Sequence, residues 1–215
     1  MKVVIQCAGR KQPGAGTFRL PDDRPVYFLA RPDLAPNDGH PYARPDDQSD
    51  DGRTWRARLI AYNREPKGNH LNLLPAYRLY AHDAYRSLVD RFGIDRVFIL
   101  SAGWGLIRAG FLTPDYDITF SASAAPWNRR RPHDSYEDYG DLPDDGAATL
   151  FLGGKDYVPL FCDLVRDLRG VKTVFFNSAR PPDLPPGFRP VRFETRTRTN
   201  WHYECARALI AGDMA

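Results

Sequence analysis

The chain has 215 residues, 42% hydrophobic and 13% aromatic, and its 30 Lys and Arg against 27 Asp and Glu give a formal net charge of +3. This composition excludes wholesale disorder, a collagen-like repeat and a coiled coil, and it is sufficient for a buried core. No run approaches the roughly 18 apolar residues that a membrane-spanning helix needs, so we expect no membrane partner.

The cysteines and histidines argue against disulfides and metal sites. Cys7, Cys162 and Cys205 are widely spaced and form no CxxC pair, which predicts neither a disulfide framework nor a Cys-rich zinc site. The histidines lack an HxxxH spacing, and the HxE…PCxxC signature of zinc deaminases is absent. We therefore expect no metal and no cofactor. The first five residues lead directly into polar ones without a signal-peptide stretch, which predicts a cytoplasmic protein.

Strands and helices are predicted to alternate along the chain. Four short runs are β-branched or aromatic, which is typical of strands buried on both faces, and a fifth, more polar run is typical of an edge strand. Three longer segments place apolar residues three and four positions apart, as amphipathic helices do. In chain order, the predicted elements are a strand at 3–5, a helix at 75–92, strands at 97–100 and 150–152, a helix at 157–168, a strand at 174–176, the edge strand at 191–193 and a helix at 200–211.

This alternation predicts an α/β fold, with a single compact domain over 1–215, a mostly parallel central sheet and helices on both faces. An α+β domain with some antiparallel pairing is the alternative. Two stretches rich in Pro, Asp, Gly and Arg fit neither element: 121–146, and 12–68, which we expect to be a long irregular insertion. An acidic cluster in the insertion is predicted to be solvated; its members are Asp46, Asp47, Asp50 and Asp51.

Small or reactive residues follow each of the four predicted buried strands. Ligands of open parallel sheets bind at the carboxyl ends of the strands, where glycines leave backbone N–H groups accessible. These positions therefore predict a binding site. Neither GxxxxGK[ST] nor GxGxxG occurs, which argues against a Walker-type nucleotidase and a Rossmann dehydrogenase. The four segments are QCAGRK at 6–11, SAGWG at 101–105, GGK at 153–155 and NSAR at 177–180.

The first of these segments contains two candidate nucleophiles. Cys7 beside Lys11 is a candidate thiolate, although a buried cysteine at a strand end is the commoner case. Lys11 is the stronger candidate, because a lysine in a glycine-rich loop can bind phosphate or, once desolvated, form a Schiff base.

The segment from Ser101 leads to Pro114, Asp115, Tyr116 and Asp117, which places two carboxylates on either side of a tyrosine. A carboxylate in this position can orient a water molecule or stabilise positive charge on a sugar. The alternative is that Asp115 caps a turn and Tyr116 packs against the sheet.

Three groups of arginines lie close to tryptophans in the sequence. Stacking surfaces beside positive charge are typical of nucleic-acid binding, although an arginine-rich surface is usually only a solvated one. His202 follows Trp201 at the predicted start of the last helix, where a histidine can bind phosphate or cap the helix. The groups are Arg53, Arg56 and Arg58 near Trp55; Arg129, Arg130 and Arg131 near Trp127; and Arg192, Arg196 and Arg198 near Trp201.

Two of these motifs resemble those of the YaaA-like proteins. The sequence ILSAGWGL at 99–106 followed by PDYD at 114–117 resembles the SAKHGL and PYD motifs of that family, and VIQCAGRK at 4–11 resembles its opening strand and Ser/Cys-x-x-x-Lys loop. Gly103 and Trp104 replace the usual Lys-His or Leu-Tyr pair, and Asp115 is inserted before Tyr116. The resemblance covers about 1–11 and 75–117, and it implies an α/β domain associated with DNA, in stress protection, modification or defence.

The first functional hypothesis is a DNA-associated enzyme that cleaves or exchanges the N-glycosidic bond of a nucleobase, in repair, modification or phage defence. Asp117 would stabilise the oxocarbenium-like sugar, Lys11 would trap the aldehyde as an imine, and a tryptophan would stack on the extruded base. The alternatives are a non-catalytic DNA-binding stress protein and an enzyme on free nucleotides or nucleosides, with the long insertion as a lid.

These hypotheses share one set of candidate residues and predict DNA as the partner, with the oligomeric state left open. The candidate catalytic residues are Lys11, Asp117 and Ser101. The candidate base or nucleic-acid contacts are Cys7, Trp104, Tyr116, Asn177, Ser178, Arg180, Arg198, Asn200, Trp201 and His202.

Overall fold

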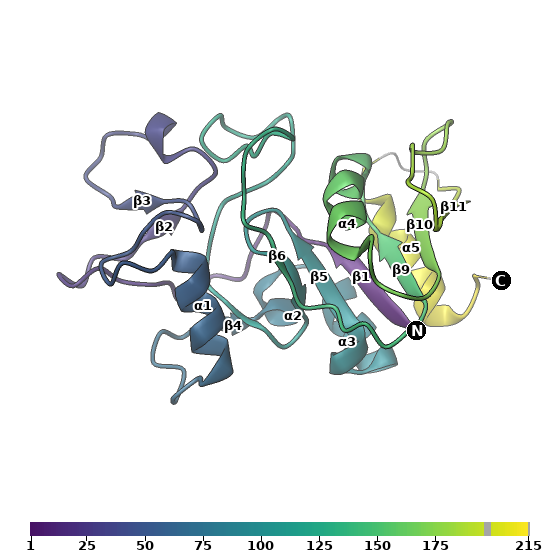
Figure 1. The fold of residues 1–215 in the computed structure, drawn as a ribbon, viewed down its shortest axis with the longest axis horizontal. Helices are drawn as coiled ribbons and strands as arrows, with labels where there is room; N and C mark the ends of the chain where they lie inside the picture. The colour runs from purple at the N-terminus through teal and green to yellow at the C-terminus, as the bar shows by residue number, and fades with distance from the viewer. Residues whose placement is uncertain (196–198, 215) are drawn as a thin grey trace.

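A seven-stranded sheet forms the centre of the computed structural model, which describes residues 1–195 and 199–214 (Figure 1). Its strands are β1 (Lys2–Gln6), β5 (Val97–Ser101), β6 (Gly105–Arg108), β8 (Tyr139–Gly140), β9 (Thr149–Leu152), β10 (Lys172–Phe176) and β11 (Phe188–Arg192). Their order is β11-β10-β9-β1-β5-β6-β8. Adjacent strands are parallel except β5 and β6, so the α/β prediction with a mostly parallel sheet is confirmed, with one antiparallel pair.

The order of the strands creates a topological switch point. The chain first passes from β1 to β5 on one side and later enters β9 on the other side of β1. Numbered in chain order, the five strands from β5 across to β11 have the order 2-1-3-4-5, one of the two common doubly wound orders. In this order, the loops that follow β1 and β9 diverge and leave a crevice between them.

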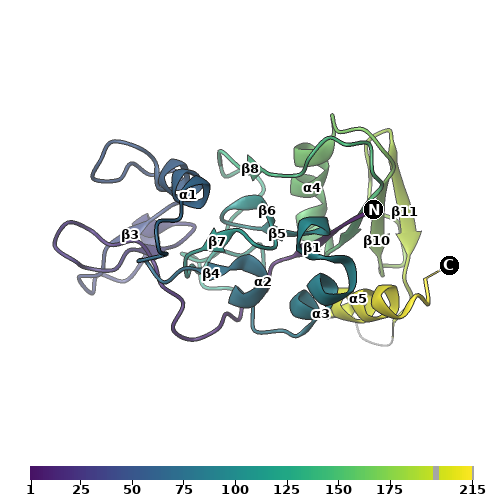
Figure 2. The ribbon, with the colours of Figure 1, turned by 90° about the horizontal axis from the view of Figure 1, so that it is seen from below.

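Helices cover both faces of the sheet. Figure 2 shows α3 (Ala84–Phe92) and α5 (Trp201–Ala211) on one face and α4 (Val158–Val165) on the other. Val3, Val4 and Ile5 of β1 consequently have no exposed surface, which explains why the run is continuously apolar rather than alternating.

The predicted helix at 75–92 is interrupted. It forms α2 (Ala76–Leu79) and then α3, because Tyr80 is extended and makes a bridge with Lys11 of the loop after β1. This bridge consists of two backbone hydrogen bonds, from Gln12 N to Leu79 O and from Ala81 N to Arg10 O. The break therefore anchors the glycine-containing loop that carries Lys11.

The predicted insertion contains short regular elements at one end of the molecule (Figure 1). The unpredicted α1 begins after Thr54, whose side chain accepts a hydrogen bond from Ala57 N. The arginines of α1 interrupt the apolar pattern in the sequence, although Trp55 and Leu59 are buried in the structure. The remaining helices and strands, beyond the main sheet and α2 to α5, are β2 (Tyr27–Phe28), β3 (Tyr42–Ala43), α1 (Trp55–Arg64), β4 (Leu74–Pro75), β7 (Leu112–Thr113) and the 3₁₀ helices Pro32–Leu34, Ile94–Arg96 and Lys155–Tyr157.

The acidic cluster of the insertion is not simply solvated, as the sequence had suggested. Asp46 forms a nearly buried ion pair with Arg56, 2.5 Å from Oδ1 to Nε. Asp50 pairs with Arg58, and Asp51 pairs with both Arg58 and Arg53. These aspartates thus neutralise the arginines of the first predicted basic group. The positions of the residues in the sequence did not predict these ion pairs.

A single methyl group at Gly105 is expected to destabilise the fold by about 2–3 kcal/mol. Gly105 has φ of +86°, and a Cβ there would lie 2.6 Å from Tyr139 N. Urea unfolding of Gly105→Ala tests this cost. Gly146→Ala is the matched control, because Gly146 has φ of +75° with nothing within 4 Å of the added Cβ. Equal losses in both variants would show that the contact with Tyr139 costs nothing.

Candidate functional site

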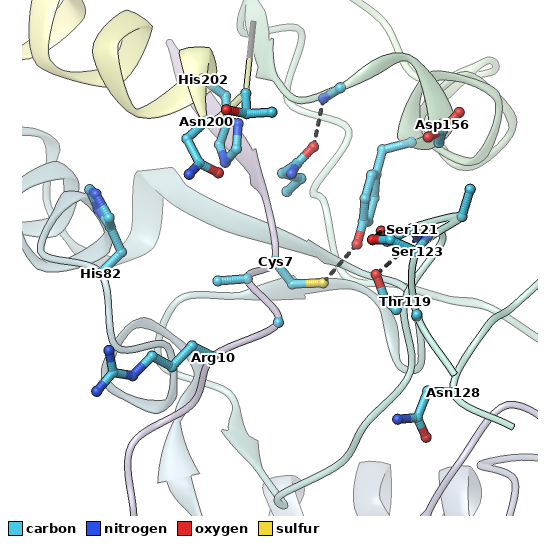
Figure 3. A pocket seen from close by; sticks show the side chains of 18 of the residues that line it. Cys7, Arg10, His82, Thr119, Ser121, Ser123, Asn128, Asp156, Asn200 and His202 are labelled. Atoms are coloured by element: carbon cyan, nitrogen blue, oxygen red, sulfur yellow. Dashed lines mark hydrogen bonds between the residues drawn. The ribbon is translucent and has the colours of Figure 1, made fainter. Parts of the chain in front are cut away.

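A pocket of about 920 Å³ lies where β1 and β9 end, and we name it the switch-point pocket. Gln6 and Cys7 from the end of β1 line it together with Gly154, which follows β9 (Figure 3). The N-terminus of α5 and the loop 119–128 complete its walls. Its volume falls within the roughly 300–1,000 Å³ of small-molecule sites, and its position is the one at which doubly wound sheets bind ligands.

Hydrogen bonds tie the end of β1 to the neighbouring elements. Gln6 Oε1 accepts a bond of 2.6 Å from Gly154 N, and Gln6 O accepts one of 2.8 Å from the Tyr85 hydroxyl. Cys7 is 4% exposed, and its Sγ lies 3.3 Å from the Tyr157 hydroxyl (Figure 3). This hydrogen-bonded thiol lies on the floor of the pocket, an arrangement that favours a structural role for Cys7 over a nucleophilic one.

The opposite wall of the pocket is rich in hydroxyl and amide groups. Thr119, Ser121, Ser123 and Asn128 all line it, and Figure 3 shows their side chains on the same side of the pocket. The hydroxyl oxygens of Ser121 and Ser123 lie 2.9 Å apart. This wall offers donors and acceptors that suit a polyhydroxylated or phosphorylated ligand.

Asp117 also lines the switch-point pocket and contacts Asn128 of this polar wall. Its backbone N donates to Phe28 O over 2.9 Å, which fixes its position, and its Oδ2 accepts a hydrogen bond from Asn128 Nδ2. Partial burial raises the pKa of Asp117, the nearby Asp115 raises it further, and Lys11 opposes both effects. Asp117 is therefore a positioned carboxyl group with a proton affinity above its usual range.

The N-terminus of α5 closes the pocket with three consecutive aromatic residues. Asn200 precedes them in the left-handed conformation with φ of 61°, and it lines the pocket as predicted. Trp201 and His202 are buried, and His202 Nε2 has no hydrogen-bond partner among residues 1–195 and 199–214. Burial, together with the neighbouring His82, lowers the pKa of His202 to about 4. His82 itself stacks on Tyr203 with 3.5 Å between the ring centroids.

The protein is expected to lose stability on acidification between pH 6.5 and about pH 4 because of His202. The pKa of His202 in the folded state lies at about 4 against an ordinary value of 6.5, so the unfolded state binds the proton first as the pH falls. The neutral His202 side chain contributes about 3 kcal/mol at most to the free energy of unfolding. This contribution is complete above pH 6.5 and is lost near pH 4. Urea unfolding across this range measures the loss. His202→Gln should reduce it, and an unchanged pH dependence in that variant would contradict the assignment.

Lys11 lines a second pocket of about 580 Å³, which shares Gly9 and Asp117 with the first. Its Nζ lies 4.1 Å from the centroid of the Tyr116 ring and donates to Gly9 O over 3.3 Å. Burial lowers the pKa of Lys11, although Cys7, Asp117 and Asp115 oppose the shift. The fold thus brings Lys11 and Asp117 together, on either side of the boundary between two pockets.

Ser101, Trp104 and Tyr116 lie inside the protein rather than on the wall of the switch-point pocket. Ser101 has no exposed surface; its Oγ donates to the Tyr116 hydroxyl over 2.8 Å and accepts from the backbone N of Gly103 and Trp104. Trp104 is 1% exposed and packs against Phe28. These contacts favour structural roles over the predicted catalytic role of Ser101 and the predicted stacking of Trp104 on a base.

The four residues directly after β10, 177–180, do not line either pocket. Ser178 and Arg180 are exposed, and the Ser178 hydroxyl donates to Arg180 O over 2.6 Å. Asn177, which precedes them, is half-buried. Of the predicted contacts, Arg198 lies outside the described residues. The fourth strand end therefore contributes none of its described polar residues to the site.

The predicted coincidence of free arginines and stacking tryptophans is not found around Trp55 and Arg130. Trp55 and Trp201 are 3% and 5% exposed, so neither offers a ring face to a nucleic acid. Arg130 forms a buried ion pair with Asp138, just as the first arginine group pairs with the acidic cluster. The sequence pattern could not distinguish an unpaired guanidinium group from one that forms an ion pair with an aspartate elsewhere in the chain.

The sequence reasoning missed several residues that line the switch-point pocket. His82 follows the break between α2 and α3, and Asp156 follows the Gly-Gly turn that the strand-end rule had already selected. The loop around Asn128 was noted for its length, which was the available signal. The missed residues are His82, Thr119, Ser121, Ser123, Asn128, Asp156 and Tyr157.

Within residues 1–195 and 199–214, no three His, Cys, Asp or Glu side chains are grouped so as to hold a metal ion. In the same part of the chain, no helix combines the length and apolarity required to cross a membrane.

The resemblance to the YaaA-like proteins is carried by the short motifs at 4–11, 99–106 and 114–117. Comparison with known proteins found no matching family model, no matching curated protein and no matching solved structure, so that resemblance rests on the motifs alone.

Proposed function

We propose that this protein is an enzyme that cleaves or exchanges the N-glycosidic bond of a nucleoside or nucleotide bound in the switch-point pocket. The observation that carries the proposal is the position of Asp117, a carboxyl group held by Asn128 beside a pocket of nucleotide size. Hydroxyl groups of the loop 119–128 face the same space.

The chemistry of the bond explains why a carboxylate is needed. As an N-glycosidic bond breaks, positive charge develops on the sugar, and a nearby carboxylate stabilises that charge or activates the attacking water. Asn128 donates to Oδ2 of Asp117, which restrains the carboxyl group and leaves Oδ1 for the ligand. Ser121 and Ser123 can meanwhile hydrogen-bond to sugar or phosphate oxygens.

A free nucleoside or nucleotide is favoured over DNA as the ligand. Arg53, Arg56 and Arg58 are held by aspartates of the insertion, and Arg130 is held by Asp138. A duplex would need several unpaired basic residues to contact its phosphates. The volume of the switch-point pocket instead suits one nucleotide, either free or extruded from a strand.

Release of free base is the direct test of this proposal. Purified protein should release base from at least one member of a panel of nucleosides and nucleoside monophosphates, as chromatography would detect. The same panel should include normal and damaged duplex DNA at two salt concentrations. Preferential action on the small ligands, with little dependence on salt, is expected. Absence of release or exchange from every compound, by protein that is folded in thermal unfolding, would reject the function.

A further inference from the structure

The second pocket contains an amine that no acidic group holds in an ion pair. Lys11 reaches into it from the loop after β1, and Asp115, Tyr116 and Asp117 form the adjoining wall. The glycine-containing stretch at 13–17 and residues 25–29 of the insertion, which include β2, enclose the rest. The pocket has about 580 Å³, enough for a small organic ligand.

The surroundings of the Lys11 amine differ from those of the other lysines. Among the described residues, no carboxylate oxygen lies within 4.0 Å of Lys11 Nζ, whose printed contacts are Gly9 O and the Tyr116 ring. Lys2 instead pairs with Asp145, and Lys172 donates to the carbonyl oxygens of Arg166 and Leu168. Lys67 and Lys155 are exposed to solvent.

We propose that Lys11 is a carbonyl-reactive amine, which forms an imine with an aldehyde bound in the second pocket. The class of ligand is a small aldehyde or the open-chain form of a pentose. The pentose as ligand rests on the proposed function, because cleavage of an N-glycosidic bond leaves a sugar whose C1 opens to an aldehyde.

The covalent step needs no additional reactant. The lone pair of the neutral amine attacks the carbonyl carbon, the C=O π electrons move to oxygen, and that oxygen takes up a proton to give a carbinolamine. Loss of a proton from nitrogen and of water from carbon then forms the C=N bond, so one amine and one aldehyde yield one imine and one water.

The environment supplies the reactive form of the amine and a group to move protons. Burial lowers the pKa of Lys11, which raises the fraction of neutral amine at pH 7. Asp117 lies on the wall of the same pocket, and its pKa is raised. A carboxyl group of higher proton affinity is suited to carry protons to and from the carbinolamine oxygen.

Reductive alkylation of the intact protein tests the proposal. Propanal and sodium cyanoborohydride at pH 7, followed by peptide mass spectrometry over time, should give a propyl adduct at Lys11 several-fold faster than at Lys67 or Lys155, since a lowered pKa leaves more of the Lys11 amine neutral. Lys11→Arg should remove the fast phase, whereas Lys155→Arg should leave it unchanged. Labelling of Lys11 at or below the rate of the exposed lysines would overturn the proposal.

A second arm replaces propanal with 2-deoxyribose or ribose 5-phosphate and traps the imine with the same reductant. An adduct at Lys11 is expected, and propyl labelling without any sugar adduct would overturn the pentose as ligand. The labelling is independent of base release. A reactive Lys11 in a protein that releases no base would reject the proposed function alone, and base release without a reactive Lys11 would reject this inference alone.

Discussion

Replacement of Arg130 by alanine is expected to lower the free energy of unfolding by about 3–5 kcal/mol, the usual cost of breaking a buried ion pair on one side. The Arg130 side chain is 7% exposed and its partner Asp138 is 10% exposed. Nη1 of Arg130 donates to Asp138 Oδ1 and to Ala102 O, each over 2.8 Å. The alanine variant would leave the Asp138 carboxylate buried without a counter-ion and the carbonyl of Ala102 without its donor.

Urea unfolding measures this loss, and an exposed ion pair provides the control. Arg166 and Asp163 are 58% and 66% exposed and lie three residues apart, so Arg166→Ala should cost less than about 1 kcal/mol. Losses of the same size in the two variants would contradict the role given to burial. The double variant Arg130→Ala, Asp138→Ala should lose less than the two single variants together, because it no longer buries an unpaired charge.

The two buried arginines explain how irregular segments support the central motif. Arg56 donates to Gly103 O over 2.9 Å, and Arg130 donates to the carbonyl of the preceding residue. Arg56 belongs to the insertion and Arg130 to the loop between β7 and β8, so both segments stabilise the turn between β5 and β6. Ser101, the last residue of β5 before this turn, donates a hydrogen bond to the Tyr116 hydroxyl. The Lys11 amine lies over the ring of Tyr116.

The main strands could be predicted from the sequence because burial on both faces leaves a continuous apolar run. The break at Tyr80 could not, because α2 and α3 have compatible periodicities and the backbone bridge between Tyr80 and Lys11 joins distant segments. The helix at Trp55 was missed for a different reason: its arginines are satisfied by aspartates earlier in the chain, so they do not mark a solvent-facing surface.

The candidate site was predicted in part by the same reasoning. The rule that ligands bind at strand ends selects Cys7 and Lys11, which line one or the other pocket. Asp117, which lines both pockets, was selected from the PDYD motif, and Asn200 was selected at the start of the last helix. The strand-end rule selects Ser101 equally, because a backbone position at a strand end does not reveal whether the side chain turns inward. Asn128 and Ser121 lie in a loop without periodicity, and only the folded chain places them on the same pocket as the end of β1.

Replacement of Asp117 by asparagine is expected to lower the rate of base release by about 10²–10⁴-fold with little change in stability, the range for loss of a positioned acid or base. Asparagine keeps the volume and the backbone bond to Phe28 O but removes the negative charge. Asp115→Asn is the matched control, since Asp115 lies two residues away and lines only the second pocket. Rates are measured under single-turnover conditions.

The pH profile separates a direct role of Asp117 from an indirect one. Asp115 raises the pKa of Asp117 and Lys11 lowers it. If the ionised carboxylate is the active form, Asp115→Asn should move the acidic limb of the profile to lower pH, and Lys11→Met should move it to higher pH. Asp117→Asn should abolish the limb. A limb that persists in Asp117→Asn, or that shifts in the same direction in the other two variants, would assign the titration to another group and remove Asp117 from the reaction.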